Sequence, residues 1–135
     1  MFNEILLALL LSASQSPDYQ PNCANPETQL DMNLCSARAA AAADAELNRL
    51  WPRVREHLQA QDREFATLRS ADRRPGYWQT ALNAQRSWLG YRDRQCALEG
   101  YEARGGTLEA MLVALCRERL TRARIVELNA VIEEG

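Results

Sequence analysis

The chain contains four cysteines, and their spacing restricts the fold more than any other feature. Cys96 lies nine residues before the pair Gly105-Gly106, and Cys116 lies ten residues after it. If these glycines turn one helix back against the next, equal distances from the turn place both sulfurs at about the same height, which suits disulfide geometry. Four cysteines allow three pairings. The hairpin selects a bond between Cys96 and Cys116 and leaves Cys23 with Cys35 by elimination.

The N-terminus predicts an exported protein. Residues 5–11 are an apolar run that is too short to span a bilayer, and small residues at 12–14 follow it, as in a signal peptide. Residues 1–4 contain no Lys or Arg, which departs from the usual pattern, and the alternative is the apolar start of a cytosolic helix. Cysteines spaced for disulfides favour export. We expect a signal peptide over residues 1–14 and a single helical domain over residues 15–135. The location is then periplasmic or secreted, without a stable membrane anchor, since no cysteine closely follows the apolar run.

Size and charge limit the classes of function. Cleavage after Ser14 leaves 121 of the 135 residues, enough for one domain with one core. The net charge changes from −2 to about −1, so nothing in the bulk charge favours nucleic acid or an anionic membrane. All 16 basic residues are Arg. Genomic base composition explains this bias, and the functional alternative is that Arg makes planar, bidentate contacts that Lys cannot.

The first predicted helix follows an extended arm rich in Pro and Asn. Thr28 is a suitable N-cap, and helical spacing of apolar residues continues over residues 29–59, where Pro52 can introduce a kink. The side chains expected on its apolar face are Leu30, Leu34, Ala37, Ala41, Asp44, Asn48 and Trp51, widened by Leu47, Leu50, Val54 and Leu58.

Two further helices complete the predicted fold. Residues 72–76 form a strong turn signal, preceded by a charged stretch in which a short helix over 63–68 can form. We expect a second helix over residues 77–103 and a third helix that is capped by Thr107. No stretch alternates as a strand does. The sequence therefore predicts an all-α fold, a small antiparallel bundle of about three long helices with two disulfides.

The sequence offers no catalytic constellation. His57 is the only histidine, and we interpret it as an exposed surface residue because it lies in a polar stretch without a metal-ligand partner at helical spacing. With four cysteines assigned to disulfides no thiol nucleophile remains, and no serine has a histidine nearby. Carboxylates such as Asp44 and Glu46 are two residues apart and do not share a helix face. We expect no catalytic residues, no metal site and no cofactor.

Four polar residues lie at apolar positions of the predicted helices. Asp44 and Asn48 interrupt the apolar stripe of the first helix, and Gln85 and Arg92 interrupt that of the second. A charge on such a stripe is costly unless it is paired. We therefore predict a partly buried network in which Asp44 meets Arg92, with Gln85 and Asn48 as hydrogen-bond partners. A structural role for this network is favoured over a ligand site.

Taken together in order, these residues resemble the LprI-like lysozyme inhibitor family. The resemblance covers roughly residues 23–128 and depends on the combined pattern. The matching residues are Thr28-Gln29, Met32-Asn33, Cys35, Ala43-Asp44, Leu47-Asn48, Gln85-Arg86, Trp88, Tyr91-Arg92-Asp93, Cys96, Gly106-Thr107 and Cys116.

The resemblance implies a secreted or envelope-located helical domain with two disulfides, and inhibition of lysozyme-type peptidoglycan hydrolases. The chain departs from the lipid-anchored type member because it lacks a lipid-attachment cysteine. The implied partner is a lysozyme-like glycosidase. The alternatives are a non-inhibitory envelope interaction or scaffold module that binds another envelope protein, and an immunity protein against a cognate cell-wall hydrolase.

A stoichiometric inhibitor of such an enzyme needs donors for two cleft carboxylates and rigid aromatic bulk. Arg73 and Arg74, with Tyr77 and Trp78, offer both at the predicted turn, although the two aromatic residues could instead enter the core. The near-neutral chain gives little long-range steering toward a strongly basic lysozyme. A neutral or acidic bacterial hydrolase is therefore an alternative target.

Overall fold

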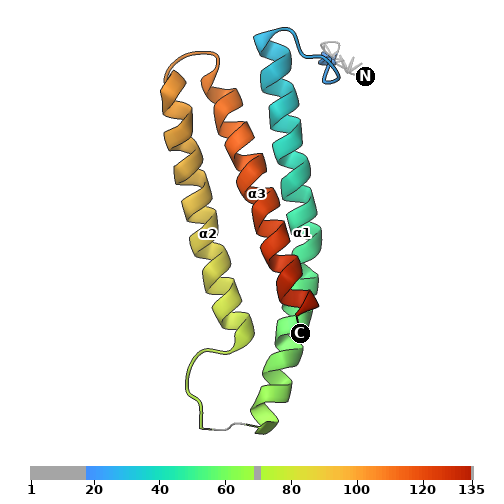
Figure 1. Cartoon of the computed structure of the whole chain (residues 1–135), viewed down its shortest axis with the longest axis vertical. Helices are drawn as coiled ribbons and strands as arrows, with labels where there is room; N and C mark the ends of the chain where they lie inside the picture. Colours follow the sequence, from blue (N-terminus) through green and yellow to red (C-terminus); the bar gives the residue numbers. More distant parts are fainter. Residues whose placement is uncertain (1–17, 69–70, 135) are drawn as a thin grey trace, which may run out of the picture.

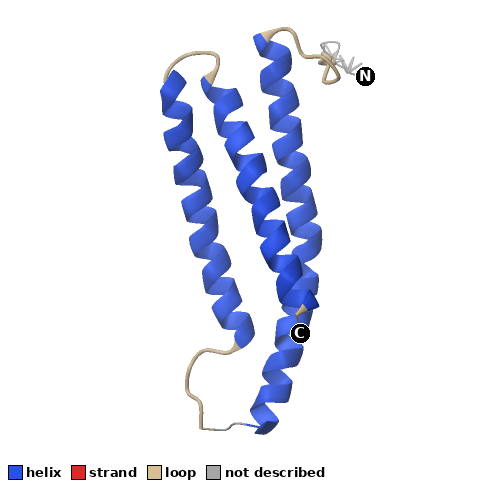
Figure 2. Ribbon diagram, viewed as in Figure 1, coloured by secondary structure: helices blue, strands red, loops and turns tan. Residues whose placement is uncertain are grey.

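A computed structural model describes residues 18–68 and 71–134, and these residues form an all-α domain without strands (Figure 2). The helices are α1 (Gln29–Leu68), α2 (Tyr77–Gly100) and α3 (Glu109–Glu133), with a short 3-10 helix, η1 (Tyr101–Ala103), after α2. The predicted fold class is confirmed. The predicted signal peptide over residues 1–14 lies outside the described residues.

The three helices stand side by side, with α2 antiparallel to both α1 and α3 (Figure 1). Helices α1 and α3 are parallel, and two contacts fix their register. The amide of Asn33 donates to the carbonyl of Thr107 at 2.9 Å, and Arg122 pairs with Glu46 at 3.3 Å. A residue of α3 therefore lies beside the residue of α1 whose number is about 75 lower. By this register Glu133, the last residue of α3, is roughly level with Leu58 of α1.

The first helix is longer than the sequence pattern predicted. We expected an end near residue 59, but α1 continues through the charged stretch to Leu68, and Pro52 lies inside it. The start is as predicted, because the hydroxyl of Thr28 accepts a hydrogen bond from the backbone N–H of Asp31 at 3.1 Å. By the register above, the last ten residues of α1 extend roughly 15 Å beyond α3.

The core lies between α1 and α3, with α2 covering one side. Its buried members are Leu47, Leu50, Val54, Leu58, Ile125 and Leu128, and Trp51, Trp78, Ala81, Trp88 and Ile132 pack against them. The buried stripe of α1 steps by three and four residues through Ser36, Ala40, Ala43, Leu47, Leu50, Val54 and Leu58. The residues that we expected only to widen the apolar face, from Leu47 to Leu58, are the buried ones, so the buried stripe is rotated about the helix from the predicted one. Of the residues that we expected to lead it, Leu30, Ala37, Ala41 and Asn48 are exposed.

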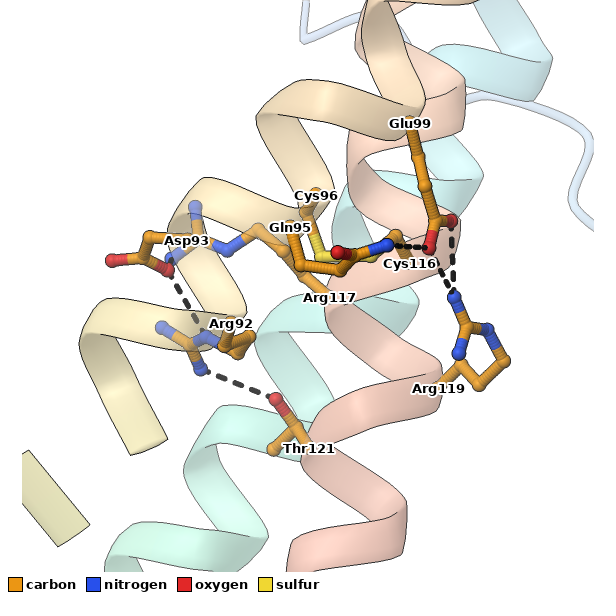
Figure 3. The surroundings of a disulfide bond; sticks show 9 residues. All are labelled: Arg92, Asp93, Gln95, Cys96, Glu99, Cys116, Arg117, Arg119 and Thr121. Carbon is orange, nitrogen blue, oxygen red and sulfur yellow. Dashed lines mark hydrogen bonds and ion pairs between the residues drawn. A yellow bond between two sulfur atoms is a disulfide. The ribbon is translucent and has the colours of Figure 1, made fainter. Parts of the chain in front are cut away.

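A disulfide joins α2 to α3 near the end where the two helices connect. Cys96 and Cys116 are bonded and almost fully buried, as predicted, and their Cα atoms lie 5.3 Å apart (Figure 3). Gly105 supplies the positive φ of 81° that the connection requires. The predicted cap at Thr107 is wrong, because α3 begins at Glu109. The carboxylate of Glu109 instead accepts a hydrogen bond from the backbone N–H of Gly105 at 3.0 Å.

The second predicted disulfide is also present. Cys23 and Cys35 are bonded, with Cα atoms 5.5 Å apart, and the bond holds the N-terminal arm against the first turns of α1. Within the part of the chain that the structure describes, no helix is apolar over a length that would cross a membrane.

Candidate functional site

Arg92 is the centre of a buried polar cluster that joins all three helices. Its Nη1 lies 2.7 Å from Oδ1 of Asp44 on α1. The same atom lies 3.2 Å from the hydroxyl of Thr121 on α3, and Nε lies 3.1 Å from Asp93 (Figure 3). The guanidinium also lies over the ring of Trp88, 5.2 Å from its centroid. The side chain is 5% exposed, so a charge at an apolar position is compensated by ionic, hydrogen-bond and cation–π partners.

The other two members of the predicted network lie elsewhere. Gln85 is buried, but its Oε1 accepts from Nε of Arg124 on α3 at 3.0 Å, and Arg124 also pairs with Glu127 at 2.7 Å. Asn48 is exposed and belongs to neither group of contacts, because α3 covers the neighbouring stripe of α1 through Leu47. The arrangement binds the protein to itself. The cluster therefore has the geometry of a structural connection between helices.

The turn between α1 and α2 is fixed by Asp62. Its two carboxylate oxygens accept hydrogen bonds from the backbone N–H groups of Tyr77 and Trp78, at 2.6 and 3.1 Å. The N-cap residue of α2 is Gly76, which has no side chain to cap the helix. Asp62 therefore supplies the cap from α1, and a negative charge there also suits the positive end of the helix dipole. Sequence analysis missed this residue, which lies 15 positions from Tyr77.

Arg73 and Arg74 lie at the surface of this turn, which we call the arginine turn (residues 71–76). Arg74 has a side chain that is 85% exposed and forms an ion pair with Asp72 at 2.6 Å. Hydrogen bonding to Asp72 raises the pKa of Arg74 above its usual value. Nε and Nη2 of Arg74 bind Asp72. A guanidinium has five donors, so binding to Asp72 holds the group in place without using all of them.

The two predicted aromatic residues have different surroundings. Trp78 is half-buried, and its ring packs against that of Trp51 with 5.2 Å between centroids. Tyr77 is 46% exposed and meets Phe65 edge-on at 6.0 Å. Trp78 thus belongs to the core, while Tyr77 remains available at the surface beside the arginine turn.

A groove lies at the end of the bundle where α2 and α3 are not connected. It has a volume of about 1110 Å³ and runs from the arginine turn along the N-terminal part of α2 and the C-terminal part of α3. We call it the wedge groove. Its lining residues are Val54, Leu58, Gln61, Asp62, Phe65, Ala66, Asp72, Arg74, Pro75, Gly76, Tyr77, Thr80, Ala81, Ala84, Arg124, Glu127, Leu128 and Val131. Sequence analysis did not predict it, although the small residues of α2 at Thr80 and Ala84 were a signal.

The histidine and the cysteines do not form a metal site among the described residues. His57 was interpreted as an exposed residue, which is wrong, because it is half-buried and its Nε2 is buried without a hydrogen-bond partner in the described structure. All cysteines are in disulfides. Among the described residues no group of His, Cys, Asp and Glu is arranged to hold a metal ion.

The comparison with protein-family models identifies a family for this chain. A family model described as "Lysozyme inhibitor LprI" matches residues 21–128, which include both disulfides, the polar cluster and the arginine turn. The chain is also 42% identical over 132 residues to an uncharacterized protein of Rhizobium meliloti (strain 1021), covering 96% of this chain and 94% of that protein. No solved structure matches the chain significantly. The chain belongs to the LprI family of lysozyme inhibitors.

Proposed function

We propose that the protein inhibits a lysozyme-type peptidoglycan hydrolase by stoichiometric binding outside the cytoplasm. The observation that carries this proposal is the family match, which spans nearly all of the described domain. The two disulfides support an extracytoplasmic location, because such bonds persist in oxidising compartments.

The arginine turn is the proposed contact with the enzyme. Glycosidases of this kind work with two carboxylates in a cleft. Arg73 and Arg74 are exposed on a turn whose exit into α2 is held by Asp62, so the donors are presented on a fixed backbone. A turn that is already ordered loses little conformational entropy on binding, which favours affinity. Inhibition then comes from occupying the cleft and excluding substrate, without a covalent step.

The experiment is a titration of a purified lysozyme with the purified mature protein on suspended bacterial cell walls. We expect loss of activity to reach its endpoint near one inhibitor per enzyme, and we expect the same stoichiometry by calorimetry. The assay is repeated over a range of salt concentrations and with a neutral or acidic bacterial hydrolase, because the target charge decides the salt dependence. Binding that leaves the hydrolytic rate unchanged would contradict inhibition and indicate an interaction module.

A further inference from the structure

The wedge groove lies at the end of the bundle where α1 and α3 end at different levels. By the register of α1 with α3, Glu133 is level with Leu58, while α1 continues to Leu68. Beyond that level α3 no longer covers α1, and Phe65 meets only Tyr77 at the start of α2 among the ring contacts of the described residues. The disulfide between α2 and α3 holds the opposite end of this helix pair together, and the groove lies at the end where α2 begins and α3 finishes. Figure 1 shows these two ends of the bundle.

The size of the groove is that of a short helix. A cylinder about 10 Å across with the volume of the groove, about 1110 Å³, is roughly 14 Å long, which corresponds to roughly nine helical residues. The lining residues of α1 run from Val54 to Ala66, a rise of roughly 18 Å along the helix, which is a similar length. Most of the floor is apolar, with Leu58, Ala81 and Leu128 among its residues. An amphipathic helix laid into an apolar groove is a common mode of recognition.

Charge at the groove indicates which end of such a helix lies where. The lining carries three carboxylates, Asp62, Asp72 and Glu127, against two guanidinium groups, Arg74 and Arg124. Glu133, the last residue of α3, and Glu134, its C-cap, add two exposed carboxylates at the end of the helix that contributes Val131 to the lining. Both guanidinium groups are already paired with carboxylates, Asp72 and Glu127. The C-terminal end of α3 adds the negative end of its helix dipole. This end of the groove therefore favours a positively charged occupant.

We propose that the wedge groove binds an amphipathic helix of the target hydrolase, with its apolar face on the floor and its basic N-terminal end beside Glu133 and Glu134. This inference rests on the proposed function, because one partner contacts both surfaces. Arg74 and Tyr77 belong to the groove lining and also stand at or beside the arginine turn. The helix of the partner completes a local four-helix arrangement next to the cleft that the arginine turn enters.

The test compares two exposed valines of α3, one inside the groove lining and one outside it. Val131 lines the groove and is 38% exposed, while Val126 is 70% exposed and lies outside the lining. Binding of a purified basic lysozyme to the mature protein is measured by calorimetry and surface plasmon resonance. We expect Val131→Arg to raise the Kd at least tenfold and Val126→Arg to leave it unchanged. Ala84→Trp fills the groove from α2 and should raise the Kd in the same way. It provides a second test in case Val131→Arg loses stability.

The charge component has its own variant. Replacing both Glu133 and Glu134 by Gln should lower the association rate about threefold or more and flatten its salt dependence, while the melting temperature stays unchanged. If folded Val131→Arg and Ala84→Trp variants bind the hydrolase with unchanged affinity, the groove is not the binding site and this inference is wrong. If those variants also still inhibit the enzyme, the proposed function stands. Failure of the wild-type protein to bind a hydrolase of either charge class would overturn both. If the groove variants change only self-association in sedimentation, the occupant is a second copy and the proposal is wrong.

Discussion

Gly76 lies directly against the carboxylate of Asp62, so that a Cβ atom at residue 76 would be 2.5 Å from Asp62 Oδ1. The same carboxylate accepts the backbone N–H groups of Tyr77 and Trp78. The absence of a side chain at Gly76 is therefore what allows Asp62 to cap α2. One contact thus sets both the start of α2 and the orientation of the arginine turn.

Removal of the Asp62 cap should destabilise the protein measurably. We expect Asp62→Ala to lower the free energy of unfolding by about 1 kcal/mol, as for other N-cap losses, with Asp62→Asn retaining part of the effect. Gly76→Ala should also destabilise the wild-type protein, because the new Cβ displaces the carboxylate. In the Asp62→Ala background the same glycine substitution should cost almost nothing. Urea unfolding of the four proteins measures this coupling, and additive costs would contradict the contact.

Loss of Arg92 should cost more than loss of Asp44. The side chain of Arg92 is 5% exposed and that of Asp44 is 38% exposed, so Asp44 is solvated when its partner is removed. Arg92→Met also leaves the buried hydroxyl of Thr121 without this donor. We expect a loss of about 2 to 3 kcal/mol for Arg92→Met, about 1 kcal/mol for Asp44→Asn, and a coupling energy near 1 kcal/mol in the double-mutant cycle.

A second ion pair between α1 and α3 provides the control for that cycle. Glu46 and Arg122 pair at 3.3 Å, and both side chains are 48% exposed. Solvent and salt screen such a pair, so we expect no measurable coupling at 0.15 M salt, on the order of physiological ionic strength. Equal coupling in the two cycles would show that burial of Arg92 has no energetic consequence.

The two disulfides should differ in their contribution to stability. Closing loops of 12 and 20 residues stabilises a fold by about 3 kcal/mol each in the chain-entropy description. The sulfurs of Cys96 and Cys116 are in addition buried, while Cys23 is exposed. Alanine replacement of the buried pair should therefore lower the melting temperature more than replacement of the pair in the arm. Peptide mapping without reduction checks the pairing, and a peptide linking Cys23 to Cys96 would contradict it.

Inhibition should depend on the arginines of the turn. Replacing both Arg73 and Arg74 by Ala is expected to raise the inhibition constant at least tenfold, because these are the exposed donors beside the groove. The melting temperature should stay near that of the wild type, since the side chain of Arg74 is 85% exposed in its pair with Asp72. Alanine replacement of Arg53 and Arg55, exposed residues of α1, is the matched control. If the double mutant of Arg73 and Arg74 inhibits as well as the wild type, the contact with the enzyme does not lie at this turn.

The N-terminal arm should respond to alkaline pH. The hydroxyl of Tyr19 donates to Asp31 at 2.6 Å, and this hydrogen bond raises the pKa of Tyr19 above its usual value of 10.0. Because the folded-state pKa is the higher one, the contact stabilises the arm below pH 10.0 and is lost as the pH rises through the raised pKa. Ultraviolet titration should show one late tyrosine, and Asp31→Asn should bring it forward. A Tyr19 titration that Asp31→Asn leaves unchanged would refute the effect.

The end of α1 shows why part of the fold could not be predicted. Apolar periodicity in α1 reports burial against a partner helix, and that partner, α3, ends level with Leu58. The pattern therefore stopped where α3 stops, while the helix itself continued to Leu68. The disulfides, the three helices and the pairing of Asp44 with Arg92 each left a sequence signal, namely cysteine spacing, apolar period and charge on an apolar stripe.

Contacts between distant residues left no such signal. Asp62 caps α2 across 15 residues, and Arg124 meets Gln85 across 39, so neither pairing appears as a local motif. The error at Asn48 has the same origin, because the position of α3 decides which flank of the α1 stripe is covered. The groove likewise depends on where three helices end relative to one another, which sequence periodicity does not encode.

Neither disulfide connects α1 to the other two helices. One bond lies between the arm and α1, and the other lies within the α2–α3 pair. A single backbone cut between residues 71 and 76 would therefore turn the monomer into two covalently separate chains that share one core. The domain is thus a natural candidate for fragment complementation. Its two halves, each carrying its own cross-link, should recombine when mixed, because the buried core residues come from both halves, Leu47, Leu50, Val54 and Leu58 from one and Ile125 and Leu128 from the other.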